Sequence, residues 1–189
     1  MASFEQDAAY LKAAADELEP FLLSDEIHWP LSPAPAGGLS RLSLGSLLLG
    51  RARLRAVNDP RLAAMEAPIE AVRAEWRTHW ERKAQRESGE RLNLWANFLS
   101  DLQDRPDRTA GEYPQEVRNR VMLDLLLAEA NLQRPANAAR LDALDGLLRQ
   151  LSQPGPFVWP AELEAGFPES RFWYLYRRFA PKSKPVSWF

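Results

Sequence analysis

The chain has 189 residues, of which 46% are hydrophobic and 26% charged, and its formal net charge is −2. These values are typical of a globular protein, so neither a wholly disordered chain nor a membrane protein is expected. The chain contains no cysteine, which excludes disulfides, thiolate metal ligands and cysteine nucleophiles and favours a cytoplasmic location. The longest dense apolar run, within residues 42–54, is interrupted by arginines and is shorter than the ~20 residues that a membrane-spanning helix needs.

The first residues predict an amphipathic helix. Ser3 followed by Gln6 fits a capping box, and apolar residues then recur at steps of three and four from Phe4 to Leu22. Pro20 is expected to end or bend this helix, because proline cannot donate to the helical ladder. Three prolines and two glycines then predict an extended connector over residues 29–38.

The next segment predicts a second helix that Ser43 caps and that runs to about Val57. A short strand over residues 39–44 is the alternative. Asp59 and Pro60 then supply an N-cap and a first helical position for a third helix.

An apolar stripe that includes Leu62 and Trp76 keeps a regular rhythm of three and four residues up to His79. This stripe predicts one long helix over residues 60 to about 87, bent at Pro68, with His79 on its buried face. Gly89 is expected to separate it from the next helix.

The second half of the chain predicts further helices over residues 92–102, from Pro114 onwards, over 141–151, and from Pro168 to about Phe179. Residues 121–128 are apolar apart from Asp124, so this stretch is expected to be the buried centre of the protein. The sequence therefore predicts an all-α fold: a compact single-domain bundle of about six to seven helices with proline-rich connectors. This domain is expected to span residues 1–179, followed by a tail over 180–189 that is rich in proline, lysine and aromatic residues.

Charge is distributed unevenly along the chain. Residues 1–26 hold seven acidic residues and one lysine, whereas residues 27–58 hold four arginines and no acidic residue. The simpler interpretation is that the acidic first helix packs beside basic segments of the same fold, and an anionic partner is the alternative. Arginines gathered on one exposed face would favour nucleic acid, and arginines paired with the first helix would favour a protein partner.

The sequence contains few residues that are typical of enzyme active sites. It has two histidines and nine glycines, and the glycines form neither of the common phosphate-binding loops. The nucleophile motif GxSxG and the zinc motif HExxH are also absent. Glu75 and His79 do not provide the ExxH pairs on two helices that a ferritin-like metal site requires. We therefore expect no metal and no cofactor.

Arg73 and His79 are separated by five residues, and this spacing resembles the R-x(4-6)-H motif of the HEPN superfamily. Members of this superfamily are small all-helical proteins that include dimeric ribonucleases. The resemblance covers residues 73–79 and implies that His79 would act as a general acid or base and that Arg73 would anchor a phosphate. In an ideal helix the two positions lie about 120° apart, which does not favour joint action. The other interpretation is a core histidine bonded to Glu75 or to a backbone carbonyl.

Two further groups of residues carry an expectation, an acidic residue within an apolar stretch and a C-terminal zone of aromatic and basic residues. Asp124 stands among apolar residues and is expected to pair with Arg120, one turn earlier. In the aromatic and basic zone 171–189 the rings that do not face the core, including Tyr174, are expected to be free for a partner. The residues expected to bind that partner are Trp173, Arg177, Arg178, Trp188 and Phe189.

The first functional hypothesis is thus a non-enzymatic helical protein that binds a protein partner or a second copy of itself. The alternative is a nucleic-acid-binding or HEPN-like ribonuclease that uses Arg73 and His79, together with Arg51, Arg53 and Arg55.

Overall fold

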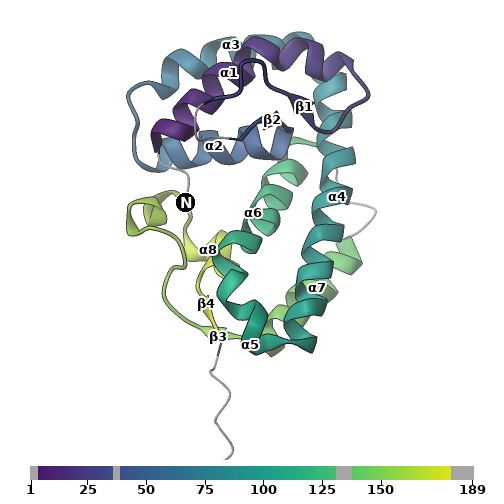
Figure 1. Cartoon of the computed structure of the whole chain (residues 1–189), viewed down its shortest axis with the longest axis vertical. Coiled ribbons are helices and arrows are strands. Elements are labelled where there is room, and N and C mark those ends of the chain that lie inside the picture. Colours follow the sequence, from purple (N-terminus) through teal and green to yellow (C-terminus); the bar gives the residue numbers. More distant parts are fainter. Residues whose placement is uncertain (1–3, 36–38, 131–137, 180–189) are drawn as a thin grey trace, which may run out of the picture.

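The computed structural model describes residues 4–35, 39–130 and 138–179 of the chain. Within this part the chain forms eight α-helices, two of them only four residues long, which confirms the all-α fold class (Figure 1). The α-helices are α1 (Phe4–Leu23), α2 (Leu44–Ala56), α3 (Leu62–Glu75), α4 (Arg77–Asp104), α5 (Pro106–Thr109), α6 (Tyr113–Glu129), α7 (Ala138–Leu151) and α8 (Glu169–Phe172). The remaining elements are the 3-10 helices η1 (Ala110–Glu112), η2 (Ala161–Gly166) and η3 (Trp173–Leu175) and the strands β1 (Trp29–Pro30), β2 (Arg41–Leu42), β3 (Gln153–Pro154) and β4 (Arg177–Arg178). Among the described helices, none carries an apolar stretch that could cross a membrane.

Both structures that the sequence offered as alternatives near Ser43, a short strand and a capped helix, are present. Strands β1 and β2 pair antiparallel, with Trp29 opposite Leu42. Ser43 follows directly, in an extended conformation, and its Oγ accepts a hydrogen bond from the backbone N–H of Ser46 at 3.3 Å. Strand β2 therefore leads directly into the predicted helix cap at Ser43.

Helix α1 continues through Pro20 to Leu23, so of the two effects predicted for this proline, an end or a bend, the end is wrong. Pro20 itself is exposed, whereas Phe21 and Leu22 are almost fully buried. Burial of these two large side chains outweighs the one ladder hydrogen bond that the proline removes. The capping residue Ser3 lies outside the described residues.

The long helix predicted over residues 60–87 is two helices. The backbone leaves the helical conformation at Trp76 (φ −107°, ψ 35°), where α3 ends and α4 begins. Helix α4 then runs without interruption through Gly89, so the break predicted there is also wrong. The break at Trp76 changes the helical phase, so that Trp80 becomes buried and His79 stays half-buried.

The described residues bury two hydrophobic clusters. The first core lies between α1, α2, α3 and the adjoining ends of α4 and α6, and it is mostly aliphatic. The second core lies between the other ends of α4 and α6, helix α7 and the C-terminal segment 152–179, and it is rich in aromatic rings. Helices α4 and α6 lie side by side and run through both regions (Figure 1). The stretch 121–128 of α6 is buried only in part: Val121, Met122, Leu123 and Leu126 are buried, whereas Ala128 is exposed, so the prediction of a stretch buried on all sides is confirmed for one side of the helix.

The C-terminal segment is irregular. The helix predicted from Pro168 to about Phe179 ends at Phe172, and a 3-10 turn and strand β4 follow, with β4 paired to β3. Phe172, Tyr174, Leu175 and Tyr176 are all buried. The 3-10 turn and strand β4 thus place three consecutive residues, Tyr174, Leu175 and Tyr176, in the core. The prediction that Tyr174 is free for a partner is therefore wrong.

Candidate functional site

Arg73 lies in a surface groove of about 450 Å³ between α3, α4 and the end of α6. We call this the Arg73 groove; it is lined by Glu70, Arg73, Ala74, Arg77, Trp80, Glu81, Ala128 and Glu129. Arg73 contacts Glu129 at 2.6 Å and Glu70 at 3.1 Å, and its guanidinium lies over the Trp80 ring, 5.4 Å from the centroid. The indole N–H of Trp80 donates to the same Glu129 carboxylate at 3.0 Å.

The charges of the Arg73 groove are thus paired with one another. Arg77 is also paired, with Glu81 at 3.0 Å. Partial burial opposes ionisation of Glu70, but hydrogen bonds from Arg51 and Arg73 lower its pKa below the ordinary value. A phosphate that approached Arg73 would have to displace two carboxylates and would meet a third acidic side chain nearby.

His79 does not line the Arg73 groove. It belongs to α4, beyond the break at Trp76, and its ring packs edge-on against the Trp76 ring at 5.5 Å. The expectation that His79 is buried in a helical seam is wrong, because the break turns Trp80 inward in its place. Arg73 and His79 therefore lie on separate helices.

The arginines of α2 are also held by carboxylates of the same fold. Arg53 pairs with Asp7 of α1 at 2.8 Å, as the interpretation of internal pairing predicted. Arg51 pairs instead with Glu66 and Glu70 of α3, at 3.2 and 2.6 Å, and Arg55 also contacts Glu66. These ion pairs join α2 to its two neighbouring helices.

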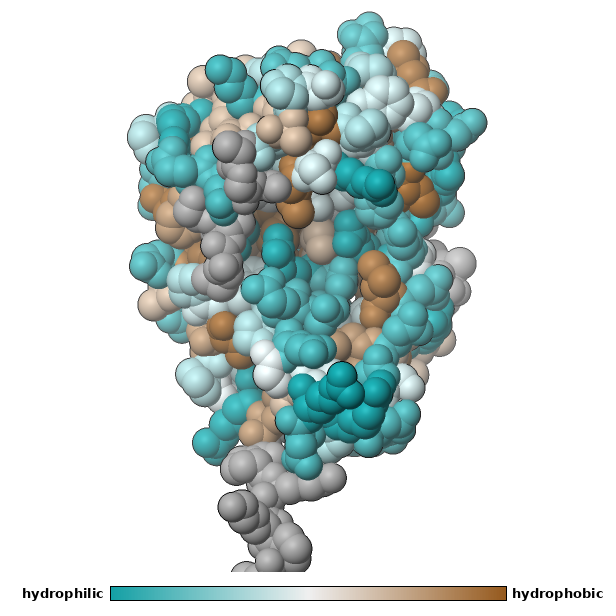
Figure 2. All heavy atoms as spheres, in the orientation of Figure 1, coloured by the Kyte–Doolittle hydropathy of each residue, from teal (hydrophilic) through white to brown (hydrophobic). Residues whose placement is uncertain are grey.

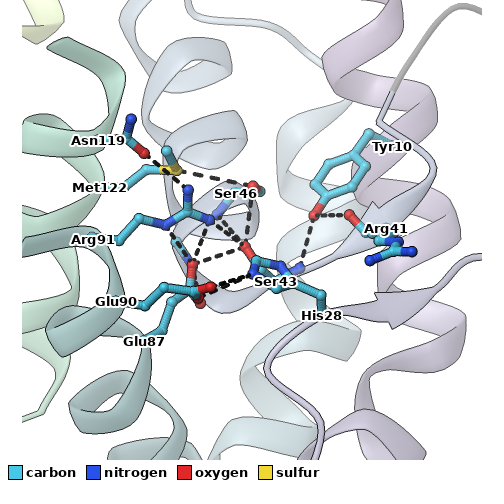
Figure 3. Close-up of polar contacts among 11 residues, drawn as sticks. Tyr10, His28, Arg41, Ser43, Ser46, Glu87, Glu90, Arg91, Asn119 and Met122 are labelled. Atoms are coloured by element: carbon cyan, nitrogen blue, oxygen red, sulfur yellow. Dashed lines mark hydrogen bonds and ion pairs between the residues drawn. The ribbon is translucent and has the colours of Figure 1, made fainter. Parts of the chain in front are cut away.

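A buried polar network lies where α2 begins (Figure 3). Glu87 of α4 is 1% exposed and accepts hydrogen bonds from the Ser43 hydroxyl and the Gly45 backbone N–H, both at 2.9 Å. Arg91 donates to Glu87 Oε1 from Nε at 3.0 Å and from Nη2 at 2.8 Å. Arg91 Nη1 also donates to Asn119 of α6 at 3.0 Å. One carboxylate thus joins α2, α4 and, through Arg91, α6.

This network is structural. A Cβ atom at Gly45 would lie 2.7 Å from Glu87 Oε1, so the approach of the carboxylate to the helix start depends on glycine. His28 pairs with Glu90 at 3.0 Å at the edge of the network, which gives this connector histidine a partner that the sequence did not show. The Glu87–Arg91 spacing of four residues was visible in the sequence, but not that the pair is buried.

The predicted pair of Asp124 and Arg120 does not form. Arg120 makes a bidentate contact with Asp145 of α7, at 3.0 and 2.9 Å, while its guanidinium lies 4.3 Å from the centroid of the Tyr174 ring. Asp124 pairs instead with Arg171 at 3.0 Å. In both cases the partner comes from a distant segment that packs on α6, so local spacing could not identify it.

The C-terminal residues predicted to bind a partner lie on η3 and β4. Trp173 is half-buried, with the guanidinium groups of Arg149 and Arg177 at 3.9 and 5.6 Å from its ring. Arg177 also donates to the hydroxyl and the carbonyl of Ser152, at 3.0 and 2.8 Å. Arg178 is exposed. Trp188 and Phe189 lie outside the described residues.

A second groove, of about 340 Å³, lies along the C-terminal half of α4 and beside α5. We call it the α4–α5 groove; it is lined by Leu94, Asn97, Phe98, Asp101, Arg105, Arg108, Thr109, Glu112 and Glu116. Leu94 is 42% exposed and Phe98, one turn later, forms the apolar floor. Asp101 and Arg105 pair across one helical turn at 2.5 Å, and among the described residues Arg108 and Glu112 have no ion-pair partner. No residue of this groove was assigned a role from the sequence, because an isolated leucine in a helical pattern is indistinguishable from a core residue.

Hydrophilic residues cover most of the face seen in Figure 2, and hydrophobic residues are confined to small separate areas. In the described ranges no three histidine or acidic side chains gather in a way that could hold a metal ion. Comparison with known proteins gives no match to a family model, to a curated protein or to a solved structure.

Proposed function

We propose that the protein is a non-enzymatic helical module that binds a segment of a protein partner in the α4–α5 groove. The observation that supports this proposal is the exposed Leu94 beside Phe98 in a hollow with charged sides. Large exposed hydrophobic side chains are few in the described part of the chain, and Leu94 is the one that lines a described groove.

The chemistry of this groove is that of a small protein interface. An apolar floor surrounded by charges resembles the core and rim of protein–protein interfaces. Fully burying an exposed leucine side chain contributes about 1.5–3 kcal/mol, and Leu94 is 42% exposed, so a partner that covers it gains a part of this value. Asp101, Arg108 and Glu112 at the sides would orient a charged segment and speed its association.

The two grooves differ in whether their charged side chains are paired within the fold. In the Arg73 groove the cations are already paired with carboxylates of the fold, and the arginines of α2 are paired as well. This arrangement favours a protein partner over nucleic acid, because each internal pair would have to be broken to free a guanidinium for phosphate. The ribonuclease alternative stays a prediction, which an assay of Arg73→Ala and His79→Ala on single-stranded RNA tests.

The proposal is tested with two matched leucine variants. Leu94→Glu places a charge in the groove, and Leu23→Glu does the same at the end of α1, where the leucine is 47% exposed. Proteins captured from native lysate by the wild type and by Leu23→Glu, but lost from Leu94→Glu, are purified and titrated against all three proteins by calorimetry. A partner that binds Leu94→Glu as tightly as the wild type would show that the groove is not the binding site.

Sedimentation of the purified protein tests the other possible partner, a second copy of the chain. Self-association that Leu94→Glu abolishes and Leu23→Glu retains would place the partner's contact in the same groove. Self-association that neither variant changes would assign it to another surface.

A further inference from the structure

The chain leaves the described part of the structure beside the α4–α5 groove. Phe179, the last described residue, packs its ring against Tyr113, with ring centroids 4.8 Å apart. The ring of Tyr113 lies 6.1 Å from that of Phe98, which lines the groove. A single tyrosine ring therefore separates the base of the C-terminal segment from the groove floor.

Resting on the function proposed above, we propose that residues 180–189 of the same chain bind in the α4–α5 groove, and that a partner segment takes their place. The segment APKSKPVSWF carries two lysines, Lys182 and Lys184, followed by two large rings, Trp188 and Phe189. The groove lining holds three carboxylates, those of Asp101, Glu112 and Glu116, against the two guanidinium groups of Arg105 and Arg108, and its large apolar side chains lie on α4. In this placement the rings cover the exposed side chain of Leu94, and the lysines lie toward Glu112 and Glu116.

The length of the segment fits this placement. From Asp101 back to Leu94 helix α4 rises roughly 10 Å, at about 1.5 Å per residue. Ten extended residues reach up to about 33 Å, so the chain can pass Tyr113 and still follow the groove to Leu94. Pro181 and Pro185 oppose a helix and favour the extended conformation that a narrow groove accepts.

The tether also decides between this segment and the same segment of a second molecule. A short covalent connection gives an attached segment an effective concentration of roughly millimolar order. Free protein at ordinary laboratory concentrations is far more dilute, so the intramolecular contact is the favoured one. A partner segment of similar basic and aromatic chemistry then has to displace it.

The test uses the full-length protein with a spin label near the end of the segment. Because the chain contains no cysteine, Ser187→Cys supplies a unique thiol for a nitroxide label. Docking predicts that the amide NMR signals of Leu94, Asn97 and Asp101 lose most of their intensity through paramagnetic broadening. The signal of Ala9, on the exposed side of α1, serves as the distant reference and keeps its intensity.

Two matched variants show whether the broadening depends on the groove. Adding Leu94→Glu to the labelled protein restores the groove signals, whereas adding Leu23→Glu does not. The proposal is overturned if the groove signals keep full intensity in the spin-labelled Ser187→Cys protein without a groove substitution. So does broadening that Leu94→Glu leaves unchanged.

A mixed sample separates the two sources of the segment. Isotope-labelled protein without a spin label is mixed with unlabelled protein that carries the nitroxide at position 187. Broadening of the groove signals in this mixture means that a second molecule supplies the segment, which overturns intramolecular docking. Broadening that occurs only when the isotope label and the nitroxide are on the same molecule supports intramolecular docking.

The two proposals fail separately. If a partner is lost from Leu94→Glu but the nitroxide leaves the groove signals unchanged, the groove binds partners and its own segment does not occupy it. If the broadening occurs and no partner depends on Leu94, the groove serves the chain itself.

Discussion

The two cores of this protein are held to their surroundings by different kinds of polar contact. Around the first core, regular helices are joined through charged side chains: Arg53 to Asp7 between α2 and α1, and Glu87 to the start of α2. Around the second core a charged pair, Arg120 with Asp145, also joins α6 to α7, but here ring donors reach backbone carbonyls as well. The Tyr113 hydroxyl donates to the carbonyl of Tyr174 at 2.5 Å, and the indole of Trp159 donates to that of Pro114 at 2.8 Å.

The difference follows from the backbone. Inside a helix the N–H and C=O groups bond to one another, so neighbouring helices can be fixed only through their side chains or their ends. The segment 152–179 is largely irregular, and its buried carbonyls need donors from elsewhere. Tyrosine and tryptophan supply both a donor and a large apolar surface, and in the second core Tyr113, Trp159 and Tyr176 use the donor in this way.

The largest expected effect comes from removing the charged link of the first core. Glu87→Ala leaves the buried Arg91 and the Gly45 N–H without their acceptor, and we expect a loss of about 3–5 kcal/mol of unfolding free energy. Glu81→Ala, on the same helix and paired only with Arg77 near the surface, should cost at most about 1 kcal/mol. Urea unfolding followed by circular dichroism measures both. Equal losses would mean that the buried network does not fix α2.

A smaller loss is expected from the ring donors of the second core, and a tyrosine in each core makes a matched pair. Tyr113→Phe leaves the buried Tyr174 carbonyl without its donor, which should cost about 1–3 kcal/mol. Tyr10→Phe should cost less, because the Tyr10 hydroxyl contacts the Arg41 carbonyl and the Ser43 N–H only at 3.4 Å. Urea midpoints of the two variants test the order. A larger loss for Tyr10→Phe would contradict the contrast between the cores.

Lys83 allows a further comparison of the two cores, because it donates to a backbone carbonyl in the first core, as aromatic rings do in the second. Its ammonium donates to the Glu26 carbonyl and the Ser24 hydroxyl in the turn after α1. Burial, with Arg86 and Arg82 nearby, lowers the pKa of Lys83 to about 8. Above this pH the native state loses the proton while the unfolded chain keeps it up to about pH 10.4, so the unfolded state binds more protons. The contribution of Lys83 to the free energy of unfolding should therefore rise between these pH values.

The measurement compares urea midpoints of the wild type, Lys83→Met and Lys12→Met from pH 7 to pH 10. The difference between wild type and Lys83→Met should grow in favour of the wild type as the pH rises. Lys12 is exposed on α1, and its variant should follow the wild type throughout. A difference that stays constant with pH would mean that Lys83 titrates in the native protein as it does in the unfolded chain.

The smallest effect on stability is expected from a substitution in the α4–α5 groove. Its residue Leu94 takes part neither in the charged contacts around the first core nor in the ring hydrogen bonds of the second. Leu94→Ser removes a side chain that is 42% exposed, and the free energy of unfolding should change by no more than about 0.5 kcal/mol. A thermal melt of this variant checks the expectation. A drop of several degrees would mean that Leu94 contributes to the packing of the fold, and it would weaken the case for a binding groove there.

The sequence predicted the elements whose signals are local. The Ser43 cap, helix α2, the buried stretch of α6 and helix α7 depend on neighbours a few residues away, and they were found. The break at Trp76 was missed because the apolar rhythm passes through it. What fixes the new phase is long-range: Glu129, on α6, accepts from the Trp80 indole and binds Arg73.

The site residues show the same limit. Glu87 and Arg91 have a spacing that predicts an ordinary surface pair, and their burial depends on Ser43 and Gly45, more than 40 positions earlier in the chain. The partners of Arg120 and Asp124 were assigned wrongly for this reason as well, because Asp145 and Arg171 reach α6 only through the tertiary fold. The two grooves are products of packing and have no sequence signal.

The sharing of α4 and α6 between the two cores also has a consequence for synthesis of the chain on the ribosome. The first core contains Leu126 and Ala130 as well as residues of α1, α2 and α3. When residue 75 has been made, the first three helices exist in sequence, but the surface of α6 that completes their core has not yet been translated. Their leucine-rich faces must therefore wait for about 50 more residues, which at roughly 5–20 residues per second takes several seconds. Nascent chains that end before residue 126 expose these faces and are the ones that a chaperone would bind, whereas chains that extend past residue 130 can close the first core.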